Sequence, residues 1–229
     1  DNETQRAAQG GSIPYDARKL LSTATIGGQP VAMKNLYNYL SYSTLNPASL
    51  LTRNGKWFLF RQTQLHMRFA EAANRAGKYR LSWGFLNSGI AGAYPAPTSD
   101  VTLYHNTLWE PYPFNFDARN SGNSGVPYYR SDWYRNIGVR ARANLMDITV
   151  PAADSLLTIE NALIKETALE NAFEGTRWPD LLRVALRRND PSFLADKIYN
   201  KMLKDGTGDA AGTRARLMNP ANWYLPFNW

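Results

Sequence analysis

The chain of 229 residues contains no cysteine and only two histidines, His66 and His105. The absence of cysteine excludes disulfides, thiolate nucleophiles and zinc sites built on cysteine. No run approaches the roughly 18 consecutive apolar residues that a membrane-spanning helix needs. The opening stretch DNETQRAAQGGSIPYD also lacks the basic and apolar segments of a signal peptide. With 44% hydrophobic and 20% charged residues, the composition is typical of a globular protein.

The net charge of +7 is unevenly distributed along the chain. Residues 56–93 carry +5, whereas the chain after residue 93 is neutral overall. Arg61, Arg68 and Arg75 recur every seven residues and therefore share one face of an expected helix. Glu71 lies within a turn of two of them. This spacing favours a solvated or acid-paired helix face, so binding of nucleic acid is not expected.

Hydrophobic periodicity predicts a mainly α-helical protein. In the stretch KWFLFRQTQLHMRFAEAANRAGK, apolar residues from Phe60 onward recur at helical spacing, and Gly77 supplies the stop. A short second helix is predicted in YRLSWGFLNSG, ending near Gly89, so that the two helices form a pair. Residues 1–55 are punctuated by IGGQP, NPAS and RNGK, which indicates loops and a hairpin.

Helical periodicity returns in the C-terminal part of the chain. Asp154 can cap a helix over residues 155–173. The apolar side of this helix is expected to carry Leu156, Ile159, Leu163, Leu169 and Phe173. The next stretch, ENAFEGTRWPDLLRVALRR, breaks at Gly175 and resumes as a helix. A further helix opens near Pro191, and the tail NPANWYLPFNW is apolar enough that we expect it to be packed down.

Three glutamates, Glu166, Glu170 and Glu174, recur every four residues and would line one face of that helix. Carboxylates in such an array can bind metal or act as general acid and base. Like charges at this spacing repel unless cations lie among them. Lys165, Arg177 and Arg183 are at hand to pair with them, so a structural charge network is the favoured interpretation.

Signatures of catalysis or of cofactor binding are few. His66 lies within the first predicted helix, where a packed or surface role is favoured. No glycine-rich phosphate loop appears, and Asp117, Asn120 and Asn123 lack the alternate-residue spacing of a calcium loop. The sequence therefore predicts neither a metal site nor a cofactor, and no enzyme activity.

The stretch ENAFEGTRWPDLLRVALRR, residues 170–188, taken with NALIKETALENAFEGTRWPDLLRVA, resembles the C-terminal signature of the SusD/RagB family of outer-membrane nutrient-binding lipoproteins. The matching positions are Glu166, Glu170, Glu174, Gly175, Arg177, Trp178, Asp180, Leu181 and Arg183. Two positions depart from the pattern: Thr167 replaces a common arginine, and Pro179 replaces a large residue. Three further stretches resemble family segments in the same order: FLFRQTQLHMRFAEAANRAGK, GVRARANL and NWYLPFNW.

The resemblance implies a mainly α fold of TPR-like helix pairs with long irregular loops. In the family, the interrupted helix is architectural: buried charge pairs lock it in place, and by that reading Trp178 belongs to the core. Family members are considerably longer, and their N-terminal half carries a lipidated cysteine. Residues 1–229 therefore resemble one C-terminal region of a longer chain, anchored at the outer membrane and cell surface through a lipid outside this chain.

The resemblance also implies a receptor that captures an oligosaccharide, or in RagB-like members a peptide, and delivers it to a SusC-like TonB-dependent transporter. Residues 94–134 are the candidate ligand-binding insertion, because they hold ten aromatic residues and five prolines without helical or strand periodicity. Sugar rings stack on such side chains. The candidate ligand contacts are Trp109, Tyr112, Tyr129, Trp133 and, as a hydrogen-bonding group, His105.

Three alternatives stay open. The aromatic residues of the insertion can instead pack the loop onto the body of the protein. A TPR-like protein-interaction module would present the basic face of Arg61, Arg68 and Arg75 to an acidic partner. A glycoside hydrolase would need two carboxylates roughly 5–10 Å apart across an open cleft. Whether the three glutamates face a cleft or an arginine-filled core separates these classes.

Overall fold

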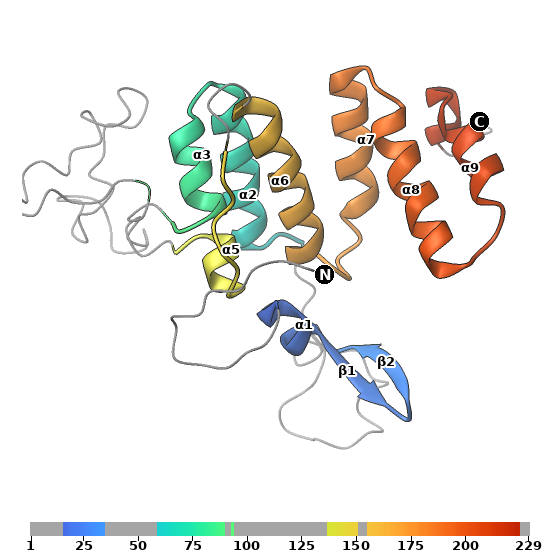
Figure 1. Ribbon diagram of the computed structural model, residues 1–229, viewed down its shortest axis with the longest axis horizontal. Coiled ribbons are helices and arrows are strands. Elements are labelled where there is room, and N and C mark those ends of the chain that lie inside the picture. The colour runs from blue at the N-terminus through green and yellow to red at the C-terminus, as the bar shows by residue number, and fades with distance from the viewer. Residues whose placement is uncertain (1–15, 35–58, 90–92, 94–136, 151–154, 225–229) are drawn as a thin grey trace, which may run out of the picture. The chain divides into compact units, whose positions relative to one another are not determined.

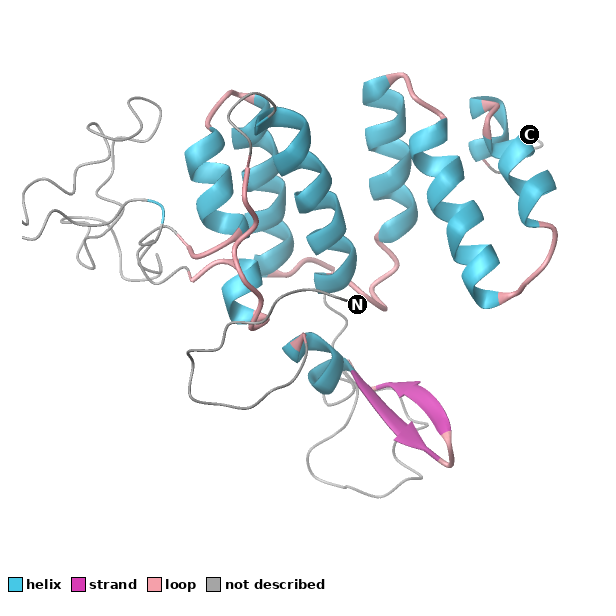
Figure 2. Ribbon diagram, viewed as in Figure 1, coloured by secondary structure: helices cyan, strands magenta, loops and turns pink. Residues whose placement is uncertain are grey.

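The computed structural model describes residues 16–34, 59–89, 93, 137–150 and 155–224. The chain divides into two compact units, Asp1–Phe173 and Glu174–Trp229, each of which is considered by itself. Helices dominate both units, and the strands among the described residues form one N-terminal hairpin (Figure 2). The prediction of a mainly α protein is confirmed. The interpretation of residues 1–229 as one C-terminal region of a longer chain stays a prediction.

The core of the first unit lies between three helices, α2 (Gln62–Arg75), α3 (Tyr79–Leu86) and α6 (Ser155–Glu170), which lie side by side (Figure 1). The buried cluster is built from residues of α2, α3 and α6, with Ala93 and one residue of the short helix α5 (Val139–Arg142). Its largest members are Phe85, Leu86, Ile159 and Leu163, each at most 1% exposed. This packing is what holds α6 in place.

The predicted pair of α2 and α3 is confirmed. Gly77 has φ +77 in the connection between them, a left-handed conformation that glycine adopts without strain. The helix α2 begins at Gln62, later than its apolar pattern suggested, and Phe60 is 61% exposed. The expectation that Phe60 belongs to the buried face of this helix is therefore wrong, because the side chain precedes the first helical turn.

The predicted hairpin is also present. The helix α1 (Ala17–Ser22) leads into strands β1 (Thr23–Ile26) and β2 (Gln29–Ala32), which pair antiparallel with Ile26 opposite Gln29. The two central residues of the turn, Gly27 and Gly28, both have positive φ, as the tight turns that fit twisted hairpins require. The side chains of β2 are exposed. Among the described residues, none of this hairpin belongs to the hydrophobic cluster of the unit. The residues flanking it make polar contacts with α6: Arg18 pairs with Glu166, and Lys34 donates to the Glu170 carbonyl.

Helix α6 ends three residues before its predicted end. The core side chains are Ile159, Leu163 and Ile164, whereas Leu169 is 39% exposed and Phe173 is 61% exposed. Phe173 has φ +66, which is incompatible with continuing an α-helix. The apolar face expected at positions 169 and 173 is therefore wrong: Phe173 follows the end of the helix at Glu170, and Leu169, although within α6, is not part of the buried cluster.

The second unit consists of α7 (Arg177–Arg188), α8 (Ser192–Asp205), α9 (Ala210–Leu217) and the 3₁₀ helix η7 (Pro220–Trp223). The break at Gly175, with φ +74, and the opening of α8 at Pro191 are as predicted. The buried cluster of this unit includes Leu181, Leu194 and Trp223. The indole of Trp223 donates a hydrogen bond to the Leu217 carbonyl at 2.7 Å, which confirms packing of the tail as far as this residue.

Candidate functional site

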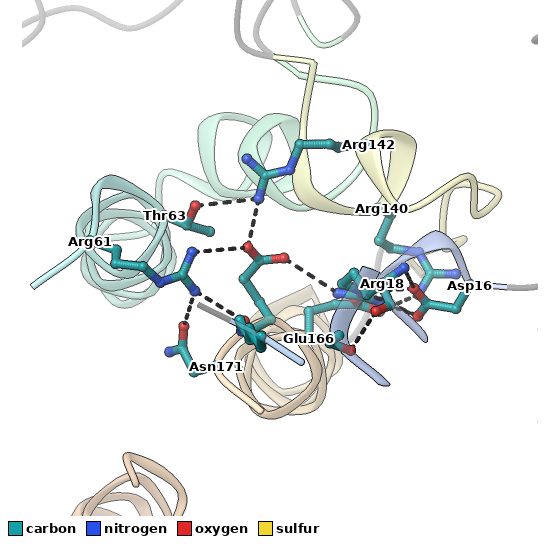
Figure 3. Close-up of polar contacts among 11 residues, drawn as sticks. Asp16, Arg18, Arg61, Thr63, Arg140, Arg142, Glu166 and Asn171 are labelled. Atoms are coloured by element: carbon teal, nitrogen blue, oxygen red, sulfur yellow. Dashed lines mark hydrogen bonds and ion pairs between the residues drawn. The ribbon is translucent and has the colours of Figure 1, made fainter. Parts of the chain in front are cut away.

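Two of the three signature glutamates lie in a buried cluster of charges, which we call the arginine–glutamate cluster (Figure 3). Its members are Asp16, Arg18, Arg61, Arg140, Arg142, Glu166 and Glu170. They come from the segment preceding α1, from α1 itself, from the N-terminal cap of α2, from α5 and from α6. The cluster therefore joins four stretches that are distant in the sequence: residues 16–18, 61, 140–142 and 166–170.

Glu166 is the most deeply buried acid of the cluster, with 1% of its side chain exposed. Its Oε1 accepts a hydrogen bond from Nη1 of Arg140 at 2.5 Å, and its Oε2 lies 2.8 Å from Nη1 of Arg18. Each carboxylate oxygen thus faces a guanidinium. Since an unpaired charge in this position would be strongly unfavourable, the two arginines are what make the burial of Glu166 possible.

Glu170 is held by a second set of cations. Its Oε1 accepts a hydrogen bond from Nη2 of Arg142 at 2.9 Å and lies 3.7 Å from Nη1 of Arg61. Arg61 also donates to the backbone carbonyl of Glu170 at 3.1 Å and to Oδ1 of Asn171 at 3.3 Å. Lys34 donates to the same carbonyl. These cations satisfy carbonyl and carboxylate groups where the helix dipole is negative, at the C-terminus of α6.

The arginines of α5 are positioned by the end of α3. Gly138 precedes α5 with φ +76, and a Cβ there would lie 2.1 Å from the carbonyl oxygen of Asn87. That carbonyl accepts a hydrogen bond from the amide of Ala141 at 3.2 Å. The guanidinium of Arg140 additionally donates to the Met146 carbonyl at 2.8 Å. Close backbone approach, which only glycine permits here, therefore directs Arg140 and Arg142 towards α6.

The electrostatics of the cluster favour its charged form. Burial opposes the charge on Arg18, but the hydrogen bonds and charges of Asp16 and Glu166 outweigh it and raise the pKa of Arg18 above its usual value. Beside the cluster, the ring of His66 lies 5.3 Å from that of Phe85. Partial burial, and then the charge of Arg142, lower the pKa of His66 below 6.5.

Glu166 and Glu170 pair with Arg18, Arg61, Arg140 and Arg142, which the sequence did not suggest as their partners. Lys165 is exposed, and Arg177 and Arg183 belong to the second unit, where Arg183 pairs with Asp180 at 3.3 Å. Glu174 follows the end of α6, so the three carboxylates do not line one continuous helix. The network is therefore built from arginines that the glutamate spacing by itself could not identify.

The other residues of the signature lie in the second unit. Asp180 is 1% exposed in the first turn of α7, where its negative charge interacts favourably with the positive end of the helix dipole. Burial lowers the pKa of Arg177, and the charge of Asp180 opposes that shift. Trp178 is 39% exposed and does not belong to the buried cluster of this unit. The expectation of a core position for Trp178 is thus not met, because the first turn of α7 presents this side chain outward.

The basic face of α2 pairs with acidic residues, which is one of the two possibilities, solvated or acid-paired, that the sequence favoured. Arg75 forms an ion pair and two hydrogen bonds with Glu160, whose side chain is fully buried in α6. Arg68 lies 4.0 Å from Glu71. Sequence reasoning identified Glu71 as a partner on the same helix but missed Glu160, Arg18, Arg140 and Arg142. The alternation of arginine with small apolar residues in VRARA is the signal that could have identified the last two.

The candidate ligand-binding residues of the insertion fall outside the residues that the structure describes. They are His105, Trp109, Tyr112, Tyr129 and Trp133. Among the described residues, no group of three or more histidines, aspartates or glutamates is arranged to hold a metal ion. In the same part of the chain, no helix is long and apolar enough to cross a membrane.

The arginine–glutamate cluster is suited to holding segments together. Each of its buried glutamates, Glu166 and Glu170, accepts a hydrogen bond from one arginine and lies beside a second. Comparison with known proteins does not add to this description: no family model, no curated protein and no solved structure matches the chain.

Proposed function

We propose that this chain is part of a SusD/RagB-type receptor that binds an oligosaccharide and has no catalytic activity of its own. The observation that carries the proposal is the setting of Glu166 and Glu170. Both glutamates belong to the signature that resembles the family, and both are buried against arginines. That setting supports the architectural role the resemblance implies for them and disfavours the open pair of carboxylates of a glycoside hydrolase.

In this proposal the charge cluster is the frame and the aromatic insertion is the binding element. The cluster joins Arg61, which precedes residues 94–134 in the sequence, to α5 and α6, which both follow them. Loops held by a rigid scaffold are where binding residues are most often found. Trp109, Tyr112, Tyr129 and Trp133 would stack on sugar rings, and His105 would hydrogen-bond to hydroxyl groups.

The cellular setting follows from the resemblance alone. The receptor would be attached to the outer membrane at the cell surface by a lipid on a part of the protein outside this chain. It would pass its ligand to a SusC-like TonB-dependent transporter. TPR-like helix pairs, such as that of α2 and α3, would form the body on which the loops are mounted.

An array of oligosaccharides and peptides tests the proposal, with each binding ligand then measured by calorimetry on the same protein. We expect saturable binding of an oligosaccharide. We also expect no release of shorter sugars, which chromatography of the incubated ligand would detect. Binding confined to peptides would replace the oligosaccharide with the RagB-like alternative. Turnover of a sugar that Glu166→Gln abolishes would contradict a receptor without catalytic activity.

A further inference from the structure

The second unit carries more positive than negative charge. From residue 174 to residue 229 the sequence has nine lysines and arginines and six aspartates and glutamates. All of these ionisable side chains lie among the described residues. The excess is therefore a property of the helices α7, α8 and α9 and of their connections.

Most of the acids in this unit are engaged at fixed positions. Asp180 pairs with Arg183 in α7, and Asp205 pairs with Lys201 in α8. Asp190 accepts hydrogen bonds from the amide and hydroxyl of Ser192 at the start of α8. Two further acids contact α9: Asp196 pairs with Arg214 at 2.6 Å, and Asp209 caps its first turn. These contacts fix the acids at helix ends and beside basic residues, and Asp190 and Asp180 also interact with the charges of Arg188 and Arg177, respectively.

Two cations meet at one aromatic ring. The guanidinium carbon of Arg188, the last residue of α7, lies 4.6 Å from the centroid of Phe193, and Nζ of Lys197 lies 4.7 Å from it. Both distances are within the range of a cation–π interaction. The ring therefore holds two like charges near one another at the junction of α7 and α8, and it restricts the freedom of both side chains.

The charges at this junction affect one another. Partial desolvation, and then the positive charges of Arg177 and Arg188, lower the pKa of Lys197, whereas Asp196 acts in the opposite direction. Asp196 also forms its ion pair with Arg214. A bound anion near Lys197 would relieve this repulsion, and restricted cations lose less entropy on binding than freely moving ones.

We propose that Arg188 and Lys197, arranged around Phe193 and supported by the charge of Arg177, form a docking surface for an acidic segment of a partner protein. The side chain of Lys197 is exposed, and so is that of Arg187, which precedes Arg188 in the sequence. A basic surface on two packed helices suits an extended chain of carboxylates, which clusters of arginine recognise through charge-assisted hydrogen bonds. The inference rests on these residues and is independent of the proposed receptor function.

Fluorescence anisotropy with the whole chain tests the surface. The probe is a labelled peptide in which glutamate alternates with serine, and a peptide with glutamine in place of glutamate is the neutral control. At an ionic strength of about 0.15 M, we expect the acidic peptide alone to bind. The double variant Arg188→Gln with Lys197→Gln should weaken its affinity about tenfold or more, because two charges in the contact are lost.

A matched control removes the same number of positive charges from the C-terminal part of α8, away from Phe193. The double variant Lys201→Gln with Lys204→Gln should change the affinity less than about twofold, because rim charges outside a contact add little. Phe193→Leu keeps every charge but removes the ring, and we expect about threefold weaker binding from the loss of the cation–π contacts. Thermal melts of each variant verify that the protein is folded at the temperature of the binding measurement.

Three results would overturn the proposal. The first is absence of binding by the unmodified chain. The second is an equal loss of affinity in the two double variants, which would reduce the effect to net charge. The third is tighter binding of oligogalacturonate than of the acidic peptide, with the same dependence on Arg188 and Lys197, because the occupant would then be an acidic sugar and not a protein.

Discussion

Arg18 and Glu166 lie at nearly opposite ends of the first unit in sequence, yet Nη1 of Arg18 is 2.8 Å from Oε2 of Glu166. The contact joins α1 to α6 and brings the N-terminal hairpin to the helical core. The amide of Ala17 adds a hydrogen bond to the Ala143 carbonyl at 3.0 Å. At the other end of the hairpin, Lys34 donates a hydrogen bond to the Glu170 carbonyl, so polar contacts with α6 flank both strands.

Replacing Glu166 by glutamine is predicted to lower the free energy of unfolding by about 3–5 kcal/mol, because Arg18 and Arg140 would keep their buried charges without the carboxylate. Chemical denaturation measures the change. Lys201→Gln is the matched control, since it breaks a solvent-exposed pair with Asp205 and should cost less than about 1 kcal/mol. Similar losses in both variants would contradict a structural role for the arginine–glutamate cluster.

Gly138→Ala is predicted to destabilise the chain by about 3 kcal/mol or more, because it combines left-handed backbone strain with a clash against the Asn87 carbonyl. Gly77→Ala is the comparison: its φ of +77 is nearly the same, but a Cβ there meets nothing within 4 Å. Backbone strain alone predicts a loss of about 1–2 kcal/mol for Gly77→Ala. Equal destabilisation of the two variants would show that the approach of Asn87 is unimportant.

The free energy of unfolding is predicted to decrease as the pH is lowered, because His66 is harder to protonate in the folded protein. Its folded pKa is lower than its unfolded value of 6.5, so the unfolded chain binds the proton more tightly. The stability that neutral His66 contributes is therefore fully present above the unfolded pKa of 6.5. It is lost as the pH falls from 6.5 towards the folded pKa. His66→Phe keeps a ring beside Phe85 and should lose less stability than the unmodified chain between about pH 7.5 and pH 5.5. Since His105 is present in both proteins, parallel curves would exclude His66 as the source.

Replacing Trp109 or Trp133 by alanine is predicted to weaken oligosaccharide binding by about 1–3 kcal/mol, which is the expected loss for a large stacked aromatic side chain. The melting temperature should change little if these residues contact ligand. Trp178→Ala is the control, because this exposed tryptophan belongs to α7 and should leave binding unchanged. A variant of Trp109 or Trp133 that melts early but binds normally once folded would assign the insertion a packing role instead.

The sequence alone determined most of the helical elements. Apolar periodicity located α2, α3 and α6, and Gly77, Gly175 and Pro191 located interruptions, because these features depend on local backbone preference and on one-sided burial. The end of α6 was less predictable. Local spacing extended its apolar face to Phe173, whereas the helix ends at Glu170 and Phe173 itself has a left-handed backbone conformation.

Only the tertiary structure decided which charges meet. The spacing of Glu166, Glu170 and Glu174 indicated a network but not its partners, since one carboxylate cannot be matched to one of many distant arginines by spacing. The close approach of Gly138 to Asn87 brings Arg140 to Glu166, and packing of α2 against α6 brings Arg61 to Glu170. Local patterns therefore fixed where the helices form, whereas long-range packing determined which buried charges are neutralised and by which residues.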